Sequence, residues 1–148
     1  IKGFAAAEVE EVYRRALAMR EKLLGGSHPD VATSLNNLAN VLQELNRDQR
    51  VGASEARARA RLGTGIGAST TDVEAMYRRA LSIQQSTLGS QNPETAKTLN
   101  NLAVLLSLRG DFSQAEQLHR DAIAASRGSS LVNRQSAEHS AAHDCVPS

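Results

Sequence analysis

The sequence contains no tryptophan and only two tyrosines and two phenylalanines, so its core must rest on aliphatic side chains and alanine. Its single cysteine, Cys145, cannot form an internal disulfide, which excludes a disulfide-stapled scaffold. No apolar run approaches the roughly 18 residues that a membrane-spanning helix needs. Lysine and arginine together number 17 against 16 acidic residues, and this balance favours neither nucleic acid nor an acidic membrane as a partner.

The first residues carry no targeting pattern. Residues 1–9 contain no initiating methionine and no charged-then-apolar stretch typical of a secretory signal. A helical pattern is already under way at the start of the chain, from which we expect a piece of a longer reading frame. Together with the composition, these features predict a cytoplasmic protein.

The dominant feature of the sequence is an internal repeat. Residues 13–39 recur as residues 77–103, 64 positions later, and 14 of the 27 aligned residues are identical. The strings Tyr-Arg-Arg-Ala-Leu and Leu-Asn-Asn-Leu-Ala occur in both copies. Repetition at a fixed period is typical of stacked-repeat proteins, whose extended surfaces bind other molecules. The repeat therefore favours a binding protein over an enzyme.

Apolar residues in both copies recur at i, i+3, i+4 and i+7, the spacing of one buried helix face. Glycines follow the predicted helix ends, where a left-handed residue is common. Pro29 and Pro93 suit a first helical turn, and Asn92 suits an N-cap. The sequence predicts five helices. They span residues 4–24, a stretch that starts at 28–30 and runs to about 46, residues 73–88, a stretch that starts at 92–94 and stops near 110, and about 112–126.

Two segments break this order. Residues 50–71 hold four of the ten glycines and no aromatic residue. Alanine and arginine favour a short helix over residues 55–62, whereas the Gly-Thr-Gly-Ile-Gly string that follows predicts flexibility. Residues 127–148 are rich in serine, alanine and histidine without periodicity, and we expect them to be disordered.

The repeated strings resemble the tetratricopeptide repeat, in the longer form found in kinesin light chains. The resemblance covers residues 5–126 apart from 50–71. It implies an all-α fold in which antiparallel helix pairs stack into a short right-handed superhelix, an α-solenoid. It also implies packing through Leu35, Leu38, Ala39 and Leu42, through Leu99, Leu102, Ala103 and Leu106, and through Val73, Tyr77, Ala80, Ala115, His119 and Ala122. His119 stands where the family usually has an aromatic residue.

Residues 50–71 interrupt the repeat. Removing them shortens the period from 64 to 42 residues, the length of the longer form, and places the segment between the two helices of one repeat. Two explanations stay open. The segment is a surface loop, which closure entropy tolerates because its cost rises slowly with length, or it is a gene-model artefact such as retained non-coding sequence.

The predicted organisation is one repeat array followed by a tail. Val9, Tyr13 and Ala16 fit a second helix whose first helix is missing, so the array begins with half a repeat. Because arrays generally need three or more repeats for stability, we expect this chain to be marginally stable. The array spans residues 4–126, with a half repeat at 4–24, an interrupted repeat at 28–88, a repeat at 92–126 and the tail at 127–148.

The resemblance further implies a binding groove, because the first helices of such arrays line a concave face. Helical geometry gives the groove residues as Thr33, Asn36, Asn40 and Gln43 on one helix and Lys97, Asn100, Val104 and Ser107 on the later one. Amide side chains both donate to and accept from a peptide backbone, which suits peptide capture. The alternative for Asn36 and Asn100 is plain exposure to solvent.

The arginine pairs at 14–15 and 78–79 are a second candidate, for an acidic partner. A solvated helix face with local ion pairs, such as Glu11 with Arg15 at i, i+4, explains them more simply. Arginines in the 50–71 segment make it basic, but no aromatic residue is there to stack on bases, so we expect no nucleic-acid partner.

No chemical site emerges. His139, His143 and Cys145 lack a fourth ligand at a typical spacing, so we expect no metal. The glycines at 63–67 have neither the Lys-Ser/Thr of a phosphate loop nor the preceding strand of a dinucleotide fold. No nucleophile, base and orienting residue come together in the repeats. We therefore expect no enzyme and no cofactor.

The sequence thus predicts a non-catalytic protein–protein interaction module that binds a peptide or a partner helix. Nucleic acid, membrane and small-molecule substrates are not expected as partners. Two alternatives stay open: a structural spacer or oligomerisation segment of a larger signalling protein, and an incomplete gene-model fragment.

Overall fold

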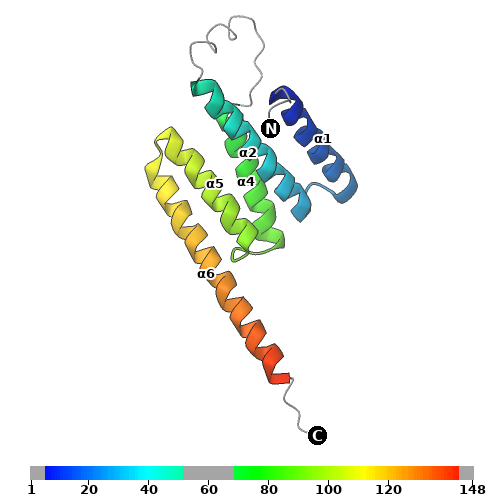
Figure 1. Cartoon of the computed structure of the whole chain (residues 1–148), viewed down its shortest axis with the longest axis vertical. Coiled ribbons are helices and arrows are strands. Elements are labelled where there is room, and N and C mark those ends of the chain that lie inside the picture. Colours follow the sequence, from blue (N-terminus) through cyan, green and yellow to red (C-terminus); the bar gives the residue numbers. More distant parts are fainter. Residues whose placement is uncertain (1–5, 52–68, 144–148) are drawn as a thin grey trace, which may run out of the picture. The chain divides into compact units, whose positions relative to one another are not determined.

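A computed structural model describes residues 6–51 and 69–143 of the chain, with the side chains of residues 8–47 and 69–128. Every regular element within these ranges is an α-helix, so the predicted all-α class is confirmed. The helices are α1 (Ala6–Leu24), α2 (Pro29–Val51), α4 (Thr70–Thr87), α5 (Pro93–Arg109) and α6 (Phe112–His143) (Figure 1). They fall into two compact units, the first ending at Ile83 and the second beginning at Gln84.

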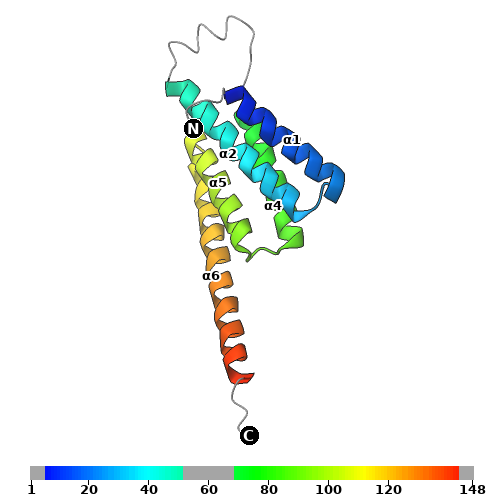
Figure 2. The same ribbon diagram turned by 45° about the vertical axis from the view of Figure 1, so that its right-hand side comes forward.

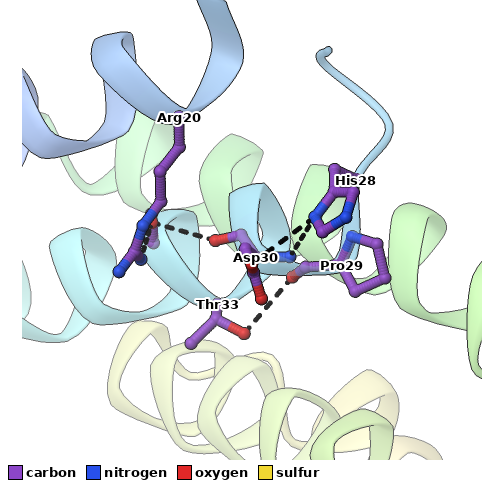
Figure 3. Close-up of polar contacts among 6 residues, drawn as sticks. Arg20, His28, Pro29, Asp30 and Thr33 are labelled. Atoms are coloured by element: carbon purple, nitrogen blue, oxygen red, sulfur yellow. Dashed lines mark hydrogen bonds and ion pairs between the residues drawn. The ribbon is translucent and has the colours of Figure 1, made fainter. Parts of the chain in front are cut away.

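In the first unit, a tight turn joins α1 to α2. Gly25 ends α1 with φ at 85°, a left-handed conformation that glycine adopts without steric cost, and its N–H donates to the Glu21 carbonyl at 3.0 Å. His28 begins α2, because its ring Nδ1 accepts from the Asp30 N–H at 3.2 Å and its carbonyl accepts from Val31 at 2.9 Å (Figure 3).

The core of the first unit lies between α2 and α4. Its buried members are Val31, Ala32 and Leu35 of α2 with Ala80 and Ile83 of α4, and Leu17 and Met76 pack against them. The N-terminal half of α2 therefore contacts the C-terminal half of this α4 segment. Tyr77, which comes earlier in α4, contacts Asn40 and Gln43, which come later in α2, so the two helices run antiparallel.

The second unit is built on the antiparallel pair α5 and α6. These helices lie side by side in both views, and α6 continues past the end of α5 (Figures 1 and 2). The predicted N-cap is confirmed, because Asn92 Oδ1 accepts from the Glu94 N–H at 2.9 Å. Gly110 ends α5 with φ at 89°. The buried residues Ala115, Ala122 and Ala125 of α6 are small, which permits a close approach of its backbone to α5.

Two predicted boundaries differ at the edges of the 50–71 segment. Helix α2 continues to Val51, past the expected end at residue 46. Helix α4 begins at Thr70, earlier than the expected residue 73. Ser69 and Asp72 explain the early start, because the Ser69 N–H donates to Asp72 Oδ2 at 2.8 Å and the Asp72 N–H donates to Ser69 Oγ at 3.3 Å. This reciprocal cap satisfies two N–H groups of the first turn. The short helix predicted at 55–62 lies outside the described residues.

The expected disordered tail is a further difference. Helix α6 extends to His143 and does not end near residue 126, while residues 144–148 lie outside the described part. Residues 127–143 contain no proline, and alanine and arginine, which make up five of these 17 residues, favour helix. The prediction of disorder relies on the absence of apolar periodicity, which indicates that a segment lacks an apolar stripe and not that it lacks helical structure.

Candidate protein-binding site

The candidate residues of α2 differ in their burial and in their hydrogen-bond partners. The Thr33 hydroxyl donates to the Pro29 carbonyl at 3.3 Å, so it is engaged within its own helix (Figure 3). Asn36 is half-buried one turn later. Asn40 and Gln43 come together on the edge of α2 that meets α4, where both amide oxygens lie against the hydroxyl of Tyr77.

Tyr77 is the centre of this polar cluster. Its hydroxyl oxygen lies 2.6 Å from Asn40 Oδ1 and 3.0 Å from Gln43 Oε1. Because a hydroxyl has one proton and also accepts, both contacts are satisfied when one amide accepts and the other turns its NH2 group toward the phenol oxygen. Burial raises the pKa of the Tyr77 phenol above its ordinary value, and the nearby Glu44 carboxylate raises it further.

The sequence pattern did not reveal this cluster. Helical spacing assigned Tyr77 to the buried face of α4 and the two amides to an open face of α2. One signal was available: a buried tyrosine hydroxyl needs a hydrogen-bond partner, and amide side chains on the neighbouring helix are the nearest polar groups that the repeat offers.

In the second unit, the candidate residues of α5 follow one side of the helix. Lys97 is exposed and pairs with Glu94 at 2.6 Å. Asn100 and Val104 are exposed one turn apart. The Ser107 hydroxyl donates to the Ala103 carbonyl of the preceding turn at 3.0 Å. Asn100 and Val104 therefore present an amide and an apolar surface side by side.

The internal repeat shows that the two units differ at these positions. By the 64-residue period, Asn40 and Gln43 correspond to Val104 and Ser107. In the resemblance to the tetratricopeptide repeat, His119 occupies the repeat position of Tyr77. All three members of the polar cluster are replaced together, so the hydroxyl–amide contacts belong to the first unit.

Four exposed arginines of α1 and α4 pair with glutamates. Arg14 pairs with Glu10 at 2.8 Å, and its repeat counterpart Arg78 pairs with Glu74 at the same distance. Arg15 pairs with Glu11 at 2.7 Å, which confirms the predicted i, i+4 pair.

Arg79 behaves differently from its repeat counterpart Arg15. It pairs with Glu21 of α1 at 2.7 Å and so links two helices. The arginine pairs therefore supply local and interhelical ion pairs. Their charges are balanced by glutamates on the same helix or the neighbouring one.

A shallow cavity of about 450 Å³ lies among α1, α2 and α4. Leu17, Leu35 and Met76 give it apolar walls, and Arg14 and Arg79 stand beside them. Both arginines are engaged by the glutamates described above, so the cavity offers no uncompensated cation to a ligand.

The helix pairs and their repeat pattern are matched by a known family. A model of the tetratricopeptide repeat family matches residues 6–62 and 72–128, which together make up most of the chain. The chain belongs to the tetratricopeptide repeat family. Repeats of this family mediate protein–protein interaction and are generally non-catalytic. The kinesin-light-chain form of the tetratricopeptide repeat expected from the sequence is consistent with this match.

Two individual proteins resemble this tetratricopeptide repeat chain. Nephrocystin-3 from Mus musculus is 48% identical over 42 residues, which are 28% of this chain and 3% of nephrocystin-3. The crystal structure of BtubC (BKLC) from P. vanneervenii matches 82% of this chain and 39% of its own, with a TM-score of 0.63 and 24% identity. The structural likeness supports the tetratricopeptide repeat fold.

In the described part of this tetratricopeptide repeat chain there is neither a cluster of metal-ligating side chains nor a membrane-spanning helix. Its histidine, acidic and cysteine side chains form no group of three suited to a metal ion. The side chains of His139, His143 and Cys145 lie outside the described residues. None of the helices described is both long enough and apolar enough to cross a membrane.

Proposed function

We propose that this chain is a non-catalytic interaction module for an extended peptide or a partner helix, with candidate contact residues on α2 in the first unit and on α5 in the second unit. The observation that carries the proposal is the pairing of exposed Asn100 with exposed Val104 on a helix whose other side is buried. The amide of Asn100 can donate to and accept from a peptide backbone, and Val104 offers an apolar contact for a side chain. The proposal includes the kinesin-light-chain-like character and cytoplasmic location expected from the sequence.

The α2 residues support the same function in a different way. Each amide of Asn40 and Gln43 uses one of its several hydrogen-bonding positions on Tyr77. The contact with Tyr77 also fixes the orientation of the remaining hydrogen-bond donors and acceptors of each amide. A fixed amide loses less conformational freedom when it binds a peptide, so its hydrogen bonds contribute more to affinity.

Charge supports a protein partner over nucleic acid. Arg14, Arg15, Arg78 and Arg79 are each paired with a glutamate and do not form an uncompensated basic patch. Nucleic-acid binding depends on such patches to neutralise phosphates. We therefore propose a protein partner, and not nucleic acid, a membrane surface or a small-molecule substrate.

The test is a peptide-library selection against the full chain and against an Asn100→Ala/Val104→Ala variant. Because both side chains are exposed, we expect the variant to keep its helical circular dichroism. Enrichment of a peptide motif by the native chain that the variant loses supports the proposal. An Arg120→Ala variant is the matched control, since it changes an exposed residue of α6 in the same unit.

Two results would contradict the proposed function. The first is enrichment of the same peptides by both the native chain and the Asn100→Ala/Val104→Ala variant. The second is enrichment by neither, with helicity intact, which favours a spacer or an incomplete array. Sedimentation of the native chain distinguishes an oligomerisation segment from an incomplete array, because an oligomerisation segment self-associates without any peptide.

A further inference from the structure

The cavity among α1, α2 and α4 in the first unit has no role in the proposed function. Its walls come from all three helices, with Leu17 of α1, Leu35 of α2, and Ala75 and Met76 of α4. Leu35 is 2% exposed and lies at the floor, whereas Ala75 is exposed at the mouth. The volume of about 450 Å³ is shallow and open on one side, so a group can enter it from solvent.

Two guanidinium groups stand at the rim of this cavity with their edges occupied. Arg14 Nε donates to Glu10 Oε1 at 2.8 Å, and Arg14 Nη2 lies 2.8 Å from the same oxygen. Arg79 Nη2 lies 2.7 Å from Glu21 Oε1. These contacts use N–H groups in the plane of each guanidinium and not its two flat faces. An aromatic ring stacks on such a face, because its negative π surface attracts the cation.

The remaining walls also suit an aromatic ring. The Met76 thioether is polarizable and makes favourable contacts with aromatic rings. Leu17 and Leu35 add aliphatic carbon, which favours an apolar group over a polar group of the same size. The guanidinium faces, the sulfur and the aliphatic floor therefore all favour the same kind of occupant.

The charges at the rim disfavour an acidic occupant. The two arginines are balanced by Glu10 and Glu21, and Asp72 adds a further carboxylate to the lining. Asp72 Oδ2 accepts from the Ser69 N–H at 2.8 Å, and no lysine or arginine pairs with Asp72 within the described residues. Negative charge is thus in excess at the rim, and it repels a carboxylate or a phosphate beside the ring.

We propose that this cavity binds an aromatic side chain of a partner protein, carried on a neutral or basic segment. The rim residues Arg14, Asp72 and Arg79 are exposed, so the ring enters from solvent while the backbone of the partner stays outside. The cavity belongs to the first unit, whereas Asn100 and Val104 belong to the second. The inference therefore adds a contact to the proposed function and does not rest on the peptide site of α5.

The chain contains a direct reporter of the cavity, because Met76 is one of only two methionines. Isotope labelling of the methionine methyl groups in the full chain gives one NMR signal from each, and a Met19→Leu chain assigns them. Met19 is 64% exposed and does not line the cavity, so it is the internal control. The probe is N-acetyl-phenylalanine amide, which is neutral. We expect a saturable ring-current shift of the Met76 signal and none of the Met19 signal.

Two further ligands test the chemistry of the cavity. N-acetyl-cyclohexylalanine amide has a ring of similar size that is more apolar but has no π electrons. We expect it to bind at least about threefold more weakly than the phenylalanine amide, because nothing attracts it to the guanidinium faces. N-acetyl-phenylalanine with a free carboxylate is also expected to bind more weakly than the amide, by a margin that shrinks as salt is added.

Two chain variants locate the ring. Arg79→Gln removes one guanidinium and is expected to weaken binding of the phenylalanine amide at least about threefold, while the affinity for the cyclohexyl compound stays unchanged. Arg78→Gln is the matched control, because Arg78 is exposed and paired with a glutamate but does not line the cavity. Both arginines are exposed, so we expect the helical circular dichroism of both variants to match that of the native chain.

An acetylated Gly-Phe-Gly amide distinguishes a protein partner from a free aromatic compound. Binding at least as tight as that of the phenylalanine amide supports a protein side chain, because the flanking backbone then finds room outside the cavity. Clearly weaker binding assigns the cavity to a free aromatic molecule and overturns the proposal.

Other outcomes would overturn the inference as well. Equal affinity for the phenyl and cyclohexyl amides means that the cavity is a general apolar surface. Equal shifts of Met19 and Met76 mean that the ring binds without preference for the cavity. Phe112 is 70% exposed, so concentration-dependent shifts of Met76 without ligand that Phe112→Ala abolishes assign the cavity to a second copy. We expect the Asn100→Ala/Val104→Ala chain to keep the Met76 shift, so failure here is distinguishable from failure of the proposed function.

Discussion

The hydroxyl of Tyr77 lies 2.6 Å from Oδ1 of Asn40 and joins α4 to α2 across the core of the first unit. Its repeat counterpart, Tyr13, has no equivalent amide neighbour among the described contacts and stands partly in solvent. The same residue type at the same repeat position therefore experiences two environments. This contrast makes the two tyrosines an internal control for one another, because the chain contains no other tyrosine and no tryptophan.

Replacing Tyr77 with phenylalanine is expected to destabilise the chain by about 1–3 kcal/mol, because it leaves the amides of Asn40 and Gln43 without their buried partner. Tyr13→Phe is the matched control and is expected to change stability by less than about 0.5 kcal/mol, since its side chain is partly exposed. Urea unfolding followed by circular dichroism gives both values. Equal midpoints for the two variants would contradict a structural role for the Tyr77 hydroxyl.

The raised pKa of Tyr77 predicts how stability depends on alkaline pH. Burial and the Glu44 carboxylate hold the folded-state pKa above the unfolded value of about 10. The contribution of Tyr77 to stability is therefore fully present below that value. It declines as the pH rises above it, because the unfolded phenol ionises first.

A Tyr13→Phe chain isolates this titration, since phenolate absorbance then reports on Tyr77 alone. We expect Tyr77 to ionise above pH 10, together with the loss of helical circular dichroism. Ionisation near the ordinary tyrosine value with the helices intact would show that the phenol is not shielded from solvent.

The elements of this fold were predictable where local rules decide them. Asn92 caps a helix and Pro29 begins another, as their residue types suggest, and the apolar spacing located every helix described. The tail of α6 was not predicted, because apolar spacing reports a packing face and not helicity itself. Alanine and arginine in this stretch favour helix whether or not the helix has an apolar stripe.

The candidate site was less predictable than the fold. Asn40 and Gln43 were assigned to an open face by helical geometry alone, yet long amide side chains at the edge of a face reach the neighbouring helix. Contacts of this kind depend on how two helices separated by many residues pack together. Their role in a groove, like that of Asn100, stays a prediction that the peptide selection tests.

The ion pair between Arg79 and Glu21 links α4 to α1 but is expected to contribute little. Both side chains are partly exposed, and the pair closes at 2.7 Å. A double-mutant cycle with Glu21→Gln and Arg79→Gln should give a coupling energy of about 0.2–1 kcal/mol that falls as salt is added. The Glu11–Arg15 pair, which lies within one helix, is the control, with about 0.3–0.5 kcal/mol expected. A coupling above about 2 kcal/mol for Arg79 and Glu21 would mean that solvent does not screen the pair as its exposure implies.

The buried side chain of Gln84 contains an unsatisfied hydrogen-bond acceptor, and a substitution that removes this acceptor should not reduce stability. Gln84 is 1% exposed, and its Oε1 has no hydrogen-bond partner among the residues that the structure describes. Its repeat counterpart Arg20 instead donates to Ser34. A buried acceptor without a partner costs about 1–3 kcal/mol, so Gln84→Met, which keeps the length of the side chain, should leave stability unchanged or raise it.

Gln84→Glu is the opposing variant, because it places a carboxylate in the same buried position and is expected to destabilise the chain strongly at neutral pH. The loss should shrink as the pH falls and the carboxyl is protonated, since the neutral acid resembles the amide in size and can donate a proton. Urea unfolding of the three chains at neutral and acidic pH separates these effects. Destabilisation by Gln84→Met comparable to that by Gln84→Glu would show that the glutamine amide makes contacts essential to this end of α4, and that its carbonyl is not a net cost.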